Sequence, residues 1–120
     1  MLAYEIQAFG QRLGLDSLAL DRNGLAQLNI DGIGSLFLEL SDSGGRRELL
    51  VYLAAQLHEH DDAAPRRLLE ACDFRQGHPF PLSAGVFSGR AIVLTRIEER
   101  QVTASGIENA LRFLAETLHA

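Results

Sequence analysis

The one tract whose side chains could bind a metal ion is His58–Asp62, with the sequence His-Glu-His-Asp-Asp. In an extended segment His58 and His60 share a face, as two imidazole ligands of zinc can do. The tract differs from the helical zinc motif, in which the second histidine follows the glutamate by three residues. We interpret it as a solvated acidic turn before a helix, because carboxylates favour the positive end of a helix dipole. We therefore predict no metal site, although the sequence alone leaves a metal at His58 and His60 open.

The other reactive residue types do not form a recognisable catalytic arrangement. Cys72 is the only cysteine and has no neighbouring base, so we interpret it as a small core or interface residue. Glu98 and Glu99 are neighbours near a predicted strand, where adjacent side chains face opposite ways. Gly32-Ile33-Gly34 begins like a dinucleotide fingerprint, but Phe37 stands where the third glycine belongs. A phosphate-binding loop needs a lysine, and the chain has none. We predict no enzymatic activity and no cofactor.

Charge narrows the classes of partner. The 120 residues include 11 Arg and 16 Asp or Glu, which gives a formal net charge of −5. Nucleic acids and anionic membranes both attract clustered basic residues, so this balance argues against either partner. The longest apolar run, Leu49–Ala55, is much shorter than the about 20 residues of a transmembrane helix. The N-terminus lacks the pattern of a secretory signal, and a lone cysteine fits a reducing compartment. We expect a cytoplasmic protein.

Two segments carry the apolar stripe of an amphipathic helix. In residues 2–13 and again in 105–118, large apolar residues recur at steps of four, three and four. Ser105 and Glu108 have the spacing of a capping box at the start of the second segment. A shorter helix is predicted over residues 65–74, after an acidic turn and with a first-turn proline.

Between these helices the period changes to alternation, which predicts strands. The predicted strands cover residues 26–30, 36–40, 48–55, 85–88 and 91–97. Leu18 and Leu20 precede the hairpin signal Asn23-Gly24, so the first group contains three or four strands. We therefore predict one α/β (α+β) domain over residues 1–120, with the order α-β-β-β-α-β-β-α and a twisted antiparallel sheet packed by helices.

Large apolar residues also stand on the strand face that the alternating leucines leave free. Phe37 alternates with the leucines of 36–40, and Leu50 and Tyr52 alternate with those of 48–55. If these two strands pair, Phe37, Leu50 and Tyr52 gather on the second face of the sheet. An antiparallel sheet commonly leaves one face polar, so a patch of this kind favours a partner-binding surface. The alternative is that a helix of the same chain covers it.

The order of elements resembles that of class I type III secretion chaperones, the CesT-like family. The resemblance rests on the meander containing Leu25–Ile30 and Leu36–Leu40, on the Leu-Leu-Glu-Ala helix end at Leu68–Ala71, and on the final strand pair and helix. It covers essentially the whole chain. Cys72 and Asp73 stand where the family often has an asparagine, and the usual C-terminal tryptophan is missing.

The resemblance implies a homodimer in the bacterial cytosol that binds the extended N-terminal segment of a secreted effector. Such a chaperone keeps the segment non-globular and soluble and presents it to the secretion apparatus, whose own ATPase drives release. Effector contacts are then expected at Phe37, Leu50 and Tyr52. The dimer interface is expected on the 65–74 helix and the 91–97 strand, with the residues Leu68, Leu69, Cys72, Ile92 and Leu94.

Two other functions stay open at the level of sequence. One is a regulatory or scaffold domain of the same fold that binds no effector, as in the YbjN-like family. A monomer whose sheet is covered favours this alternative. The other is an enzyme whose site is assembled from residues far apart in sequence. A deep polar pocket that contains a group with a shifted pKa favours the enzyme.

Overall fold

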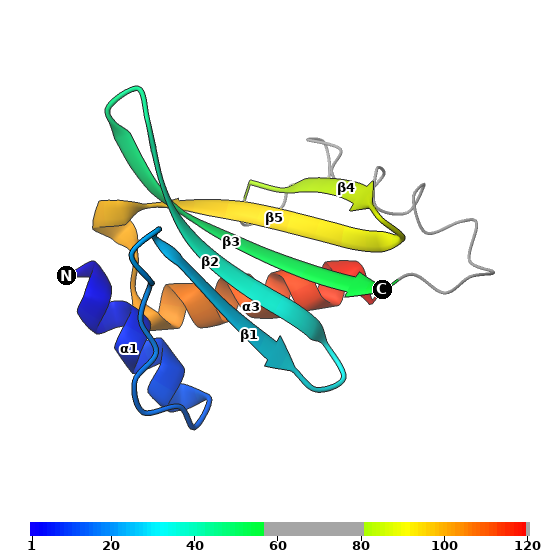
Figure 1. The fold of residues 1–120 in the computed structure, drawn as a ribbon, viewed down its shortest axis with the longest axis horizontal. Helices are drawn as coiled ribbons and strands as arrows, with labels where there is room; N and C mark the ends of the chain where they lie inside the picture. Colours follow the sequence, from blue (N-terminus) through cyan, green and yellow to red (C-terminus); the bar gives the residue numbers. More distant parts are fainter. Residues whose placement is uncertain (57–80, 120) are drawn as a thin grey trace.

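The computed structural model of the chain describes residues 1–56 and 81–119. Within them lie two α-helices, a 3₁₀ helix and five strands (Figure 1). Their bounds are α1 (Leu2–Arg12), β1 (Leu25–Ile30), β2 (Gly34–Ser43), β3 (Arg46–Gln56), β4 (Ser83–Phe87), β5 (Arg90–Glu98), η2 (Glu99–Gln101) and α3 (Ala104–Leu118). The strands form one antiparallel sheet in the order β1-β2-β3-β5-β4. The predicted α+β class is confirmed, and the predicted helix over 65–74 lies outside the described residues.

No strand forms at Leu18 and Leu20 in the described chain, so the first group contains three strands, the smaller of the two predicted numbers. Leu18 instead packs against α1, so closely that a Cβ added to Gly10 would lie 2.6 Å from the Leu18 Cβ. The Asn23-Gly24 turn leads into β1 and does not join two strands. It is held by the Asp21 carboxylate, which accepts a hydrogen bond from the Asn23 N–H at 2.8 Å. This side-chain turn is a local alternative to a hairpin.

Helix α3 begins with a cap that differs from the predicted one. Its N-cap is Thr103, whose Oγ1 accepts a hydrogen bond of 2.9 Å from a backbone N–H of the first turn. The predicted capping box of Ser105 and Glu108 is therefore wrong. A second free N–H of this turn, that of Ala104, donates to the Glu5 carboxylate of α1 at 2.9 Å. Because the first N–H groups of a helix have no partner inside it, α1 helps to complete the start of α3.

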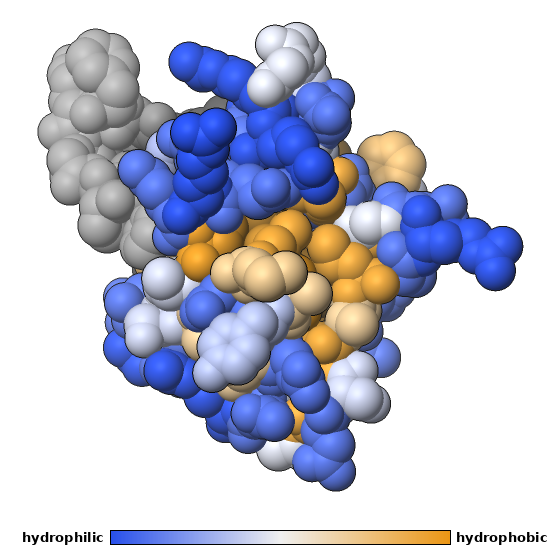
Figure 2. All heavy atoms as spheres, turned by 90° about the vertical axis from the view of Figure 1, so that its left-hand side faces the viewer, coloured by the Kyte–Doolittle hydropathy of each residue, from blue (hydrophilic) through white to orange (hydrophobic). Residues whose placement is uncertain are grey.

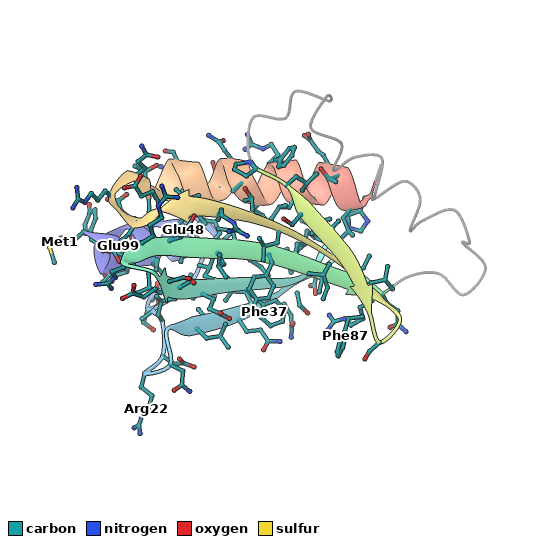
Figure 3. All side chains as sticks on the ribbon, turned by 90° about the horizontal axis from the view of Figure 1, so that it is seen from above. Met1, Arg22, Phe37, Glu48, Phe87 and Glu99 are labelled. Carbon is teal, nitrogen blue, oxygen red and sulfur yellow. The ribbon has the colours of Figure 1, made fainter. Side chains whose placement is uncertain are left out.

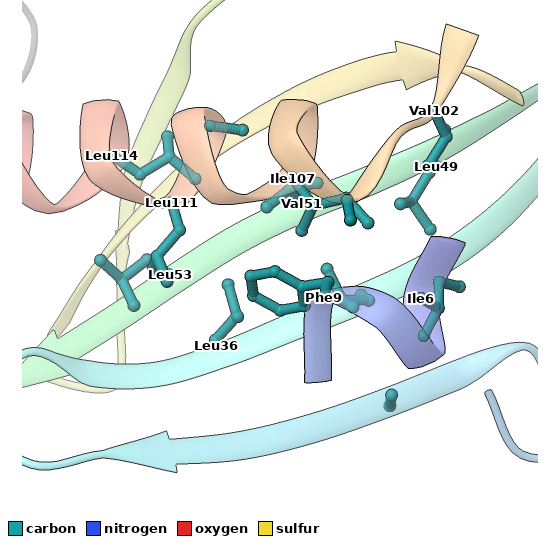
Figure 4. Packing of buried hydrophobic residues seen from close by; sticks show 14 of the residues in the cluster. Ile6, Phe9, Leu36, Leu49, Val51, Leu53, Val102, Ile107, Leu111 and Leu114 are labelled. Carbon is teal, nitrogen blue, oxygen red and sulfur yellow. The ribbon is translucent and has the colours of Figure 1, made fainter. Parts of the chain in front are cut away.

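The core lies between one face of the sheet and the two α-helices (Figure 4). In Figure 1, α3 runs behind the strands. The largest fully buried side chains are Ile6 and Phe9 of α1, Leu36 and Leu38 of β2, Leu49, Val51 and Leu53 of β3, Val93 and Thr95 of β5, and Ile107 and Leu114 of α3. Since side chains alternate along a strand, the residues between these positions project from the opposite face.

We predict that Leu114→Ala lowers the free energy of unfolding by about 2–5 kcal/mol, because its side chain is fully buried and leaves a cavity. Urea denaturation measures the change. Glu116→Ala, on the exposed side of the same helix, is the matched control and should change the value by less than about 0.5 kcal/mol. A similarly small change for Leu114→Ala would show that α3 does not pack as described.

The two glycines of the Gly32-Ile33-Gly34 segment serve the turn between β1 and β2. Both have positive φ, +77° at Gly32 and +144° at Gly34. A Cβ added to Gly34 would lie 2.4 Å from the carbonyl oxygen of Ala54 in β3, whereas one added to Gly32 would meet nothing within 4 Å. The spacing that resembles a dinucleotide fingerprint therefore reflects a tight turn and a close approach of two strands.

The pair Gly34→Ala and Gly32→Ala separates these two effects. We expect Gly32→Ala to cost about 1 kcal/mol of stability through the left-handed backbone alone. Gly34→Ala adds a steric clash with the backbone of β3 and should cost about 3 kcal/mol or more. Chemical denaturation of the two variants tests this order. Equal losses would contradict the close approach at Gly34.

Candidate partner-binding surface

The sheet face turned away from α1 and α3 carries a group of large apolar side chains. We call it the open face and define it by Phe37, Leu50, Tyr52, Ile92 and Leu94. In the register of the strands Phe37 is paired with Tyr52, and Tyr52 with Leu94. The rings of Phe37 and Tyr52 are stacked, with centroids 4.8 Å apart and planes inclined by 9°. Strand alternation thus brings together Phe37, Leu50 and Tyr52, as the sequence pattern predicts.

The five residues of the open face are half-buried, in contrast to the fully buried residues of the core face. Figure 3 places Phe37 over the middle of the sheet, whereas Met1 and Phe87 lie towards its two ends. Both described α-helices pack against the other face. In the part of the chain that the structure describes, the open face therefore presents apolar surface without a helix across it.

Ile92 and Leu94, which the sequence analysis assigns to a dimer interface, lie on this same open face. They alternate along β5 with Ala91 and Val93, which point into the core. The effector residues and the dimer residues were expected on separate surfaces. The structure shows that Ile92 and Leu94 lie beside Tyr52 and Ala54 on the same face. The sequence pattern does not indicate that β5 pairs directly with β3, and this pairing is what joins the two sets of residues.

Other predicted site residues lie outside the described residues. These are Leu68, Leu69 and Cys72 of the expected dimer helix, together with the tract His58–Asp62. Within residues 1–56 and 81–119, no three His, Cys, Asp or Glu side chains gather into a metal-binding group. No helix in these two ranges is long and apolar enough to span a membrane.

A polar contact fixes one end of the aromatic pair. The Tyr52 hydroxyl donates a hydrogen bond of 3.1 Å to Oε1 of Glu39. Burial, together with the hydrogen bond and the negative charge of Glu39, raises the pKa of Tyr52 from 10.0 to about 12. The phenol is therefore neutral at physiological pH, and the ring of Tyr52 is held in one orientation beside Phe37.

A second polar chain crosses the opposite end of the open face. The guanidinium of Arg90 in β5 reaches over β3 and donates to Oγ of Ser35 in β2 at 3.1 Å. Ser35 Oγ in turn donates to Oδ1 of Asn29 in β1 at 3.0 Å. This chain of hydrogen bonds was not predicted from the sequence. The sequence does place Arg90 on the same strand face as Ile92 and Leu94, because the three residues alternate along β5. Its hydrogen bond to Ser35 could not be predicted, because it depends on the order of the strands in the sheet.

A charged cavity lies away from this surface, between the β2–β3 hairpin and η2. It measures about 450 Å³ and is lined by Gly45, Arg46, Arg47, Glu48, Glu98, Glu99 and Arg100. The charges of its three arginines and three glutamates sum to zero. Within it, Arg47 Nε lies 2.9 Å from Oε2 of Glu99. Tyr52, whose pKa is raised, does not line this cavity.

A second apolar area lies at the end of the molecule where the chain begins. Figure 2 shows apolar side chains gathered there between charged ones. Met1 is 98% exposed and Tyr4 on α1 is 68% exposed. This area was not predicted from the sequence, because the hydrophobic period of the first helix indicates only its inward stripe.

The sequence and the fold now identify the family. The family model for the type III secretory system chaperone SycN matches residues 2–119. The chain belongs to this family. The protein is thus a type III secretion chaperone, in agreement with the resemblance seen in the sequence. The sequence of this chaperone has no match among curated proteins.

Solved structures share the fold of the chaperone. A chain of the HopA1–SchA chaperone–effector complex has a TM-score of 0.73 and 19% identity, with 97% of this chain and 88% of that chain covered. For the ExsC–ExsE complex the TM-score is 0.72 and the identity 27%, with 97% and 86% covered. For the Yersinia pestis chaperone SycH in complex with a fragment of YscM2 the values are 0.68 and 15%, with 98% and 99% covered.

The raised pKa of Tyr52 gives a direct test of the open-face geometry. The folded state favours the neutral phenol, so its contribution to stability is complete below pH 10 and is lost as the pH rises towards 12. The chain has two tyrosines, no tryptophan and no lysine, so phenolate absorbance is easily followed. We expect a titration step near pH 12 that disappears in Tyr52→Phe and moves to lower pH in Glu39→Gln. A step unaffected by Glu39→Gln would contradict the contact with Glu39.

Proposed function

We propose that this type III secretion chaperone holds an extended N-terminal segment of a secreted effector on its open face. The observation that carries the proposal is the half-buried Phe37–Tyr52 stack, which lies on a sheet face that neither described α-helix covers. A segment laid across the stack would remove its remaining apolar surface from water, which is favourable. In support, one structurally similar chain comes from the HopA1–SchA chaperone–effector complex.

The sheet also suits an extended rather than a folded partner. Among the described strands, β1 and β4 are its two edges, and each is paired with one described strand. An extended segment can hydrogen-bond to such an edge with its backbone while its alternate side chains occupy apolar sites. Binding in this form keeps the segment non-globular until it is presented to the secretion apparatus, whose ATPase we propose as the source of energy for release.

We further propose that the chaperone acts as a homodimer in the bacterial cytoplasm and has no enzymatic activity. The expected dimer residues are Leu68, Leu69, Cys72, Ile92 and Leu94. The half-buried Ile92 and Leu94 on β5 support an interface, because they extend the apolar surface beyond Tyr52 towards the β4 edge. A second copy on this side would leave Phe37 and the β1 edge for the effector.

We predict that Phe37→Ala and Tyr52→Ala each weaken effector binding by about 1–3 kcal/mol, as the loss of an interface anchor does. Their melting temperatures should fall much less than that of Leu114→Ala, because both side chains are half-buried and not in the core. Isothermal titration of the purified chaperone with the N-terminal segment of its effector measures the affinity.

Tyr4→Ala is the matched control for this experiment, since it removes an exposed aromatic ring from α1 and leaves the open face intact. It should bind the effector segment as the wild type does. If Phe37→Ala and Tyr52→Ala unfold at markedly lower temperature and still bind normally when folded, the two residues serve stability, and the proposed site is wrong.

A further inference from the structure

The open face is electrically polarised along β2. Phe37 lies between Glu39 and Ser35, two residues away on either side and on the same face. At one end stands the Glu39 carboxylate, and at the other the Arg90 guanidinium, which is held at Ser35. Four residues of a strand span about 13 Å. A negative and a positive group thus frame the aromatic stack, one on each side of Phe37, and each strand position lies about 7 Å from Phe37, the spacing between alternate side chains of an extended chain.

Arg90 is the cation of this pair, and it is held in place without a carboxylate partner in the described residues. Its one hydrogen bond there goes to the neutral Ser35. Arg47 and Arg96 differ in this respect, since they lie 2.9 and 4.0 Å from the carboxylates of Glu99 and Glu48. A guanidinium has five N–H donors in a fixed plane, so Arg90 retains donors for a carboxylate from outside.

Glu39 is the matching anion at the other end. Its Oε1 accepts from the Tyr52 hydroxyl, which fixes the carboxylate without neutralising it. In the described part of the chain, no arginine or histidine forms an ion pair with Glu39. A carboxylate accepts about four hydrogen bonds, so Glu39 has capacity for a cationic group of a partner.

We propose that the open face selects an extended partner segment with a basic, an apolar and an acidic side chain at successive alternate positions. The apolar side chain lies on the Phe37–Tyr52 stack, the basic one pairs with Glu39, and the acidic one pairs with Arg90. This inference rests on the proposed function and adds the chemistry of the segment that is bound. Charge pairs of this kind contribute to specificity and register as well as to affinity.

The test uses short synthetic peptides with a central leucine flanked at alternate positions by Arg and Asp, by two Arg, by two Asp, or by two Gln. Binding to the isotope-labelled chaperone is measured by NMR titration, which also reports where the peptide binds. We expect the Arg/Asp peptide to bind about tenfold more tightly than the like-charge peptides, with shifts centred on the open face.

Two charge reversals should change the preference in opposite directions. In Arg90→Glu both ends are negative, so the peptide with two Arg should bind best. In Glu39→Arg both ends are positive, so the peptide with two Asp should bind best. Arg96→Glu is the control, because it reverses a charge on the same strand face that lies outside this pair. It should leave the preference for the Arg/Asp peptide unchanged.

The outcomes separate this inference from the proposed function. Equal binding of the four peptides at the open face would overturn the charge selection and leave the proposed function intact. If no peptide shifts open-face signals, the inference is overturned. Effector binding by Phe37→Ala then decides whether the proposed site also fails. If Arg90→Glu instead converts a dimer into monomers in sedimentation, Arg90 and Glu39 bind a second copy, which also overturns the inference.

Discussion

The structure depends on the packing of both described α-helices against a single face of the sheet. Side chains from α1 and α3 tie the helices to each other: the Glu5 carboxylate accepts the Ala104 N–H at 2.9 Å, and Arg12 Nη1 lies 3.4 Å from Oε1 of Glu108. With both helices committed to the core face, strand alternation requires Phe37 and Tyr52 to project from the other face. The open face is therefore a direct consequence of how the core is closed.

The sequence predicts the helices and strands of this fold better than it predicts how they pair and contact one another. The stripes at 2–13 and 105–118 and the alternating strands follow from hydrophobic period. That period, with the pairing of β2 and β3, also places Phe37 beside Tyr52. The cap of α3 could not be predicted, because Thr103 acts together with Glu5 from about one hundred residues away. The insertion of β5 between β3 and β4 is a long-range pairing, and it alone explains why Ile92 and Leu94 join the surface of Tyr52.

The same topology explains the polar parts of the surface. Glu39 and Tyr52 come from paired strands, whereas Arg90 must cross β3 to reach Ser35. These contacts hold the stacked rings and the two charged groups in fixed positions on a sheet that is rigidly packed from behind. A preorganised surface loses little conformational entropy when it binds. The entropy that opposes binding then comes mainly from the ordering of the extended segment. Such a surface suits the proposed binding of an extended effector segment that is later released.

Photo-crosslinking from position 37 tests the central claim most directly. A photoreactive amino acid replaces Phe37 in one variant and the exposed Tyr4 in another, and each is illuminated in the complex with the effector. The account predicts a crosslink from position 37 to the N-terminal segment of the effector and none from position 4. A crosslink from position 37 to a second copy, or to another segment of the same chain, would contradict it and show that the open face is covered in another way.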